Sequence, residues 1–196
     1  MVELGGLDAA RAHVVVPGLL ADAIERGVDD IEMRAQLVRA LEGFPDGVDR
    51  IVVTCSTLGG VAEELAPADG PPVIRVDRPM AEAAVAAGHR IGVAYSISST
   101  VLPTSRLLWE VAATAGSAID LDLIDCEASW KYFVAGDHEQ YHGSIADSIR
   151  QRAHDVDVVV LAQASMAAVA PLLGDLEIPV VASPVLAVAR ALSFSE

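Results

Sequence analysis

The chain has 196 residues, enough for one large domain or two small lobes, and 53% of them are hydrophobic. A net charge of −15, together with no apolar run of about 18 residues, argues against nucleic acid and membranes as partners. Two cysteines give no disulfide framework, and the N-terminus lacks the basic and apolar regions of a signal peptide, so we expect a cytoplasmic protein.

Short β-branched runs alternate with helical patterns along the chain. The expected strands are 13–16, 50–54, 72–76, 90–94, 118–124, 157–162 and 178–182. The expected helices are 19–26, 30–42, 57–65, 80–87, 102–115, 138–154, 166–173 and 184–192. This alternation predicts an α/β fold with doubly wound parallel sheets, whose sites lie beyond the carboxyl ends of the strands.

Two strand–turn–helix units in the two halves of the chain are similar to each other. Residues 51–59 and 158–166 each contain a four-residue apolar strand, a small polar turn and the start of a helix. This pattern is typical of an internal duplication. We therefore expect two similar lobes, residues 1–88 and 89–183, with the C-terminal helix 184–196 packed back on the first lobe.

The turn Cys55-Ser56-Thr57 joins a buried strand to a helix, which places unpaired backbone N–H groups at its start. These groups can hold a carboxylate or an enolate oxygen, and the helix dipole favours a thiolate on Cys55. The alternative is that Cys55 packs as a small hydrophobic residue, as many cysteines do. The polar neighbours and the position at a strand end favour the functional interpretation.

Other polar residues are open to two interpretations. Ser96 and Thr100 follow the strand 90–94 and could bind a second carboxylate or cap the next helix. Cys126 lies between two acidic residues, which would raise its pKa, so we interpret it as structural. Arg75 could approach the site or form a surface ion pair. No three histidines or cysteines are spaced as metal ligands, and we assign no metal.

Taken in order, these motifs resemble the aspartate/glutamate/hydantoin racemase superfamily, which also includes maleate isomerase and arylmalonate decarboxylase. The resemblance rests on residues 55–57, 72–80, 91–104 and 161–166. It implies a racemase-like pair of α/β lobes around a small carboxylate substrate, which is an amino acid, a hydantoin or a dicarboxylate. It also implies proton transfer between two cysteines without a cofactor, in a homo-oligomer.

The resemblance assigns roles to individual residues, with two departures. It places the first catalytic cysteine at Cys55 and the turn of the second at Gln163, and it gives substrate contacts to Ser56, Thr57, Ser96, Thr100, Ala164 and Ser165. Gln163 is the first departure, because an amide cannot exchange a proton with carbon near neutral pH. The second is that the first lobe lacks the strand–helix unit which precedes residues 13–16 in the family.

Three functions therefore remain open. The first is a racemase or isomerase that acts on a small carboxylate through Cys55. The second is a decarboxylase or other lyase, for which one thiol suffices because it protonates one face of an enolate. The third is a non-catalytic relative that binds carboxylates.

Overall fold

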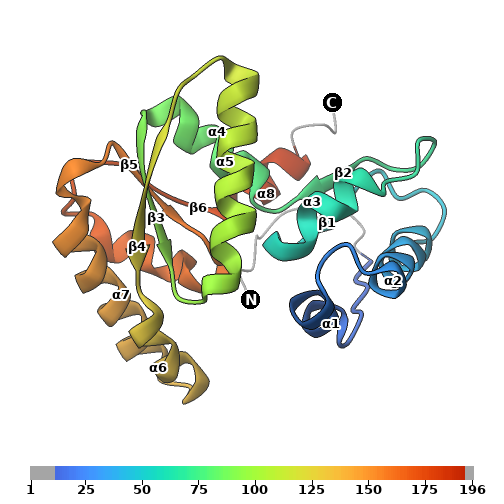
Figure 1. The fold of residues 1–196 in the computed structure, drawn as a ribbon, viewed down its shortest axis with the longest axis horizontal. Coiled ribbons are helices and arrows are strands. Elements are labelled where there is room, and N and C mark those ends of the chain that lie inside the picture. Colours follow the sequence, from blue (N-terminus) through green and yellow to red (C-terminus); the bar gives the residue numbers. More distant parts are fainter. Residues whose placement is uncertain (1–11, 193–196) are drawn as a thin grey trace.

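Two separate parallel β-sheets organise the chain, and the computed structural model describes residues 12–192 (Figure 1). The smaller sheet pairs β1 (Ile51–Val53) with β2 (Val73–Arg75). The larger sheet has the order β4-β3-β5-β6, with β3 at Arg90–Tyr95, β4 at Asp120–Asp125, β5 at Val158–Leu161 and β6 at Val180–Ala182. All the pairings are parallel, which confirms the α/β class.

Helices connect these strands, and apart from α6, which was not predicted, the bounds of the α-helices agree closely with the predicted ones. The α-helices are α1 (Leu19–Arg26), α2 (Ile31–Glu42), α3 (Ser56–Glu64), α4 (Arg78–Ala87), α5 (Val101–Ala115), α6 (Trp130–Val134), α7 (His138–Arg152) and α8 (Ser183–Leu192). The 3₁₀ helices are η1 (Ser98–Thr100), η2 (Glu127–Ser129), η3 (Ala153–Asp155) and η4 (Ala164–Leu173). None of the helices in residues 12–192 is long and apolar enough to cross a bilayer.

Two predictions about elements were wrong. Residues 13–16 form no strand, and Val15 is 67% exposed, because no neighbouring strand offers this β-branched run a hydrogen-bonding edge in the described chain. Residues 166–173, predicted as an α-helix, belong to the 3₁₀ helix η4, which contains Pro171. Proline lacks a backbone N–H and clashes with the preceding turn of an α-helix, which makes a regular α-helix unfavourable around Pro171.

Both faces of the larger sheet are covered. Val158 and Val160 of β5 pack with α4 and α5, whereas the alternate residues Val159 and Leu161 pack with α7 and η4. This alternation follows from the two-residue period of a strand, and it makes the larger sheet doubly wound. Figure 1 shows α7 and α5 on its opposite sides.

The smaller sheet has its own hydrophobic cluster, formed by β1 with α1, α2 and α3. Helix α2 begins at an Asp30 N-cap, whose carboxylate accepts a hydrogen bond from the Met33 N–H at 2.9 Å. Helix α4, which falls within the predicted first lobe, packs instead in the cluster of the larger sheet. The lobe boundary at residue 88 therefore stays a prediction.

Candidate functional site at the strand ends

Cys55 is the N-cap of α3, directly after β1. Its side chain is half-buried against the cluster of the smaller sheet and makes no capping hydrogen bond. Within residues 12–192, the N–H groups of Ser56, Thr57 and Leu58 have no hydrogen-bond partner, and the first paired amide is that of Gly59. The predicted arrangement of a thiol beside free N–H groups is thus present at this turn.

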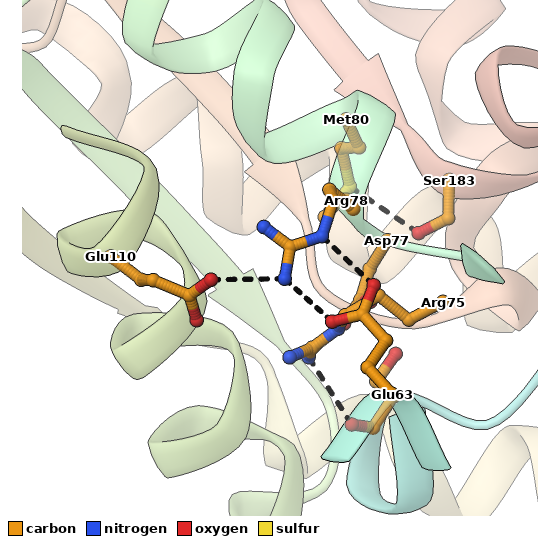
Figure 2. Close-up of polar contacts among 8 residues, drawn as sticks. Glu63, Arg75, Asp77, Arg78, Met80, Glu110 and Ser183 are labelled. Atoms are coloured by element: carbon orange, nitrogen blue, oxygen red, sulfur yellow. Dashed lines mark hydrogen bonds and ion pairs between the residues drawn. The ribbon is translucent and has the colours of Figure 1, made fainter. Parts of the chain in front are cut away.

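A buried ion pair between Arg75 and Asp77 contacts the Cys55 turn through the Ser56 carbonyl (Figure 2). Arg75, at the end of β2, donates two hydrogen bonds to Asp77, with N···O distances of 2.6 and 2.9 Å. The same guanidinium group approaches the carbonyl of Ser56 at 3.4 Å. Arg75 is 4% exposed and Asp77 is fully buried, so the expected surface ion pair does not form, whereas Arg75 does approach the Cys55 turn.

Gly59 is required for this contact. A Cβ atom at position 59 would lie 2.7 Å from the Cβ of Arg75, which is closer than side-chain atoms pack. Glycine therefore allows α3 to lie directly on the buried arginine. The sequence carried this signal as the pair Gly59-Gly60 inside a helical pattern, which often indicates close packing.

A second arginine joins three helices beside this pair (Figure 2). Arg78 at the start of α4 donates to both carboxylate oxygens of Glu63 on α3, at 2.9 and 2.5 Å, and to Glu110 on α5 at 3.0 Å. The hydrogen bond to Glu63 is the main reason why the pKa of Arg78 is raised. Arg78 thus links the smaller sheet's helix α3 to the helices of the larger sheet.

Gln163 follows β5 and is held by the end of the neighbouring strand β3. Its Oε1 atom accepts hydrogen bonds from the N–H groups of Ser96 (2.7 Å) and Ile97 (3.0 Å) and from the Ser96 hydroxyl (3.1 Å). Gln163 is 9% exposed. The residue expected at the second cysteine position is therefore immobilised by hydrogen bonds.

The network continues to Tyr141, which sequence reasoning missed. Its hydroxyl lies 2.8 Å from that of Ser96 and 3.1 Å from that of Ser165, and the whole side chain is buried. His142 adds a contact from its Nε2 to the Ser165 carbonyl at 3.2 Å. Tyr141 occupies an apolar position of helix α7, so the pattern indicated only a core residue.

The structure brings together some predicted site residues and not others. Gln163, Ser96 and Ser165 share one network, whereas Ala164 is exposed and the Thr100 hydroxyl donates to the Ile97 carbonyl at 2.8 Å. Among the described residues, the hydrogen bonds of the Cys55 turn and those of Gln163 have no residue in common. Helix α3 does pack against η1, which follows Ser96 closely.

Cys126 is not available as a second thiol. It is 2% exposed, and its Sγ lies 3.6 Å from the Ile124 carbonyl. Burial, with a smaller contribution from Asp125, raises its pKa to about 11. The predicted direction of the shift is confirmed, but burial is a larger cause than the neighbouring charge.

Two surface cavities lie away from Cys55 and Gln163. One, of about 310 Å³, is lined by residues of α4 and α5 such as Val85 and Val111, and the other, of about 220 Å³, lies between β2, Arg78 and Arg190. Neither is lined by Cys55 or Gln163. We favour the strand ends as the site, because parallel sheets place their chemistry there. In residues 12–192, no three His, Cys, Asp or Glu side chains are grouped as a metal site.

No protein-family model and no curated protein matches this sequence, but solved structures do. The aspartate racemase of Picrophilus torridus aligns with 90% of this chain and 74% of its own, at 18% identity and a TM-score of 0.64. A glutamate racemase of Bacillus anthracis (RacE1) aligns with 85% of this chain and 65% of its own, at 19% identity and a TM-score of 0.58. The allantoin racemase of Klebsiella pneumoniae aligns with 82% of this chain and 64% of its own, at 24% identity and a TM-score of 0.56.

These neighbours share the order of parallel strands and helices over most of this chain, while the chain spans only about two thirds to three quarters of their lengths. Identities of 18 to 24% are a likeness of fold. The structural neighbours agree with the fold that the sequence motifs predicted, and the chain has the α/β fold of these aspartate, glutamate and allantoin racemase structures.

Proposed function

We propose that this protein is a racemase-like enzyme that moves a proton at the carbon next to the carboxylate of a small substrate, with Cys55 as the proton carrier. The observation that supports this most strongly is the half-buried Cys55 thiol beside three N–H groups without partners at the start of α3. Such N–H groups stabilise a carboxylate or an enolate oxygen.

In the proposed reaction, the Cys55 thiolate takes the proton from the substrate carbon and becomes a thiol. The electrons of the C–H bond move into the carboxylate, and the N–H groups of Ser56 and Thr57 stabilise the resulting enediolate. Return of the proton to the same face regenerates the substrate. Inversion requires a donor on the other face, and since Gln163 is an amide, that donor would have to be water.

A lyase reaction is the second candidate, because it needs only one proton donor and Gln163 is an amide that supplies no second one. In a decarboxylation, the bond between the substrate carbon and one carboxylate breaks and carbon dioxide leaves. The electron pair that remains forms an enolate, which takes a proton from the Cys55 thiol, and solvent then restores that proton. One thiol is sufficient for this sequence of steps.

Proton exchange at carbon tests the proposal. Candidate amino acids, hydantoins and malonates are incubated with the enzyme in D₂O, and deuterium incorporation is followed by NMR. We expect incorporation that is lost in Cys55→Ala and kept in Cys126→Ala, which removes only the buried thiol. Inverted product identifies an isomerase, and carbon dioxide from a malonate identifies a lyase.

Binding without exchange, unchanged in Cys55→Ala, would contradict both catalytic proposals and leave a non-catalytic carboxylate-binding protein. Several other expectations accompany the proposal: a reaction without an organic cofactor, a cytoplasmic location, two lobes that meet near residue 88, and a homo-oligomer. Light scattering coupled to size-exclusion chromatography measures the last of these directly.

A further inference from the structure

Gln163 fills a position whose surroundings are suited to a carboxylate oxygen. Two backbone N–H groups, from Ser96 and Ile97, converge on its Oε1 atom together with the Ser96 hydroxyl. Converging N–H groups of this kind are a common means of binding anions in proteins. Because an N–H group only donates, the atom that faces these groups must be the amide oxygen, which fixes the orientation of the side chain.

The hydroxyl groups of Ser96, Tyr141 and Ser165 form a chain of hydrogen bonds that ends at the Gln163 Oε1 atom, with each proton directed toward that atom. Oε1 accepts only, so the Ser96 hydroxyl donates to it at 3.1 Å. The Ser96 oxygen then accepts from the Tyr141 hydroxyl at 2.8 Å, and the Tyr141 oxygen accepts from the Ser165 hydroxyl at 3.1 Å. Hydrogen bonds in such a chain polarise one another, so the position favours an atom with negative charge.

We propose that Gln163 is a built-in occupant of the second carboxylate position, and that the protein therefore accepts substrates with one carboxylate and excludes dicarboxylates, including the malonates of the lyase candidate above. This inference rests on the proposed function, in which the N–H groups at Ser56, Thr57 and Leu58 hold the substrate carboxylate. Within residues 12–192 the amide nitrogen of Gln163 makes no hydrogen bond. This N–H₂ group is therefore a donor that remains available to an acceptor oxygen of the substrate.

Amide NMR with acetate as the probe tests this assignment. In the wild-type protein, acetate is expected to shift the peaks of Ser56, Thr57 and Leu58 and to leave those of Ser96 and Ile97 unchanged. In Gln163→Ala, which removes the occupant, acetate is expected to shift the Ser96 and Ile97 peaks as well. Potassium chloride at equal ionic strength is the control for salt effects.

Gln163→Glu is the matched variant, because its carboxylate keeps the acceptor oxygen in place. Its Ser96 and Ile97 peaks are expected to stay insensitive to acetate. The alanine variant leaves two buried N–H groups unpaired, so acetate at ten times its Kd should raise its melting temperature by about 3 °C more than that of the wild type. If the alanine variant does not fold, Gln163→Ser, which is also too short to reach both N–H groups, takes its place.

The assignment is overturned if acetate already shifts the Ser96 and Ile97 peaks in the wild type. It is also overturned if acetate shifts these peaks in neither Gln163→Ala nor Gln163→Ser. Failure of the proposed function gives a different result. In that case the Ser56, Thr57 and Leu58 peaks do not respond to acetate, while the short variants still gain the response at Ser96 and Ile97.

Discussion

Replacing Asp77 with alanine should lower the free energy of unfolding by about 3 to 5 kcal/mol, because it leaves a buried charge without its partner. Arg75 is 4% exposed and donates to Asp77 at 2.6 and 2.9 Å. Without that carboxylate, the guanidinium keeps, within residues 12–192, the long contact of 3.4 Å to the Ser56 carbonyl. The loss is a large share of a stability of about 5 to 15 kcal/mol.

The chain contains a matched control for this variant. Arg150 and Asp175 form a pair of the same two-bond geometry, at 3.0 and 3.1 Å, but their side chains are 37% and 58% exposed. Solvent screens such a pair, so Asp175→Ala should lower the free energy of unfolding much less than Asp77→Ala does. The hydrogen-bond geometry is nearly the same in both pairs, but Arg150 also donates to the Leu172 carbonyl at 2.6 Å, so the comparison tests burial together with this additional partner.

Urea denaturation, followed by circular dichroism, measures both losses. The double variant Arg75→Met/Asp77→Leu replaces the ion pair by apolar side chains and should regain most of the stability lost in Asp77→Ala. Equal losses in Asp77→Ala and Asp175→Ala would refute the argument from burial. A double variant as unstable as Asp77→Ala would show that packing of the arginine stem, and not its charge, is what the structure needs.

Three further variants probe close contacts and buried polar atoms. Gly88→Ala should cost about 1 to 3 kcal/mol in urea denaturation, since its Cβ would lie 2.2 Å from that of Asp157, and an unchanged midpoint would contradict this contact. Thr104→Val should be neutral or stabilising by about 1 kcal/mol, because the buried Thr104 hydroxyl has no partner in the described chain; a clear loss would reveal a partner. The Cys126 thiol has a pKa of about 11 in the folded protein and an ordinary value of 9.0. As the pH rises, the unfolded chain therefore loses this proton at a lower pH than the folded chain does. Stability should therefore fall by about 2 kcal/mol as the pH rises from 9 to 11, and Cys126→Ala should lack this part of the fall.

The sequence predicted most of the larger sheet because its strands are buried on both faces. Val158 to Leu161 are four consecutive apolar residues between polar turns, and such a run has few alternatives to a central strand. The run at residues 13–16, which also contains three consecutive valines, forms no strand. Local propensity cannot reveal whether a neighbouring strand is present to pair with it.

The candidate site was only partly predictable for a related reason. Cys55 and Gln163 follow strands directly, so the rule for parallel sheets located both of them. Tyr141 lies on a helix distant in sequence, and its hydroxyl meets Ser96 only through tertiary packing. The burial of Arg75 was equally hidden, because it depends on Gly59 of another element.

The small size of the β1–β2 sheet has a consequence for how the molecule opens. Three residues from each strand form this ladder, whereas β3 is flanked on both sides by longer pairings. Local unfolding requires less free energy where fewer buried contacts are lost, so backbone amides of β1 and β2 should exchange with solvent through partial opening. Amides of β3 and β5 should exchange only when the whole chain unfolds, which divides the protein into two cooperative units with different lifetimes.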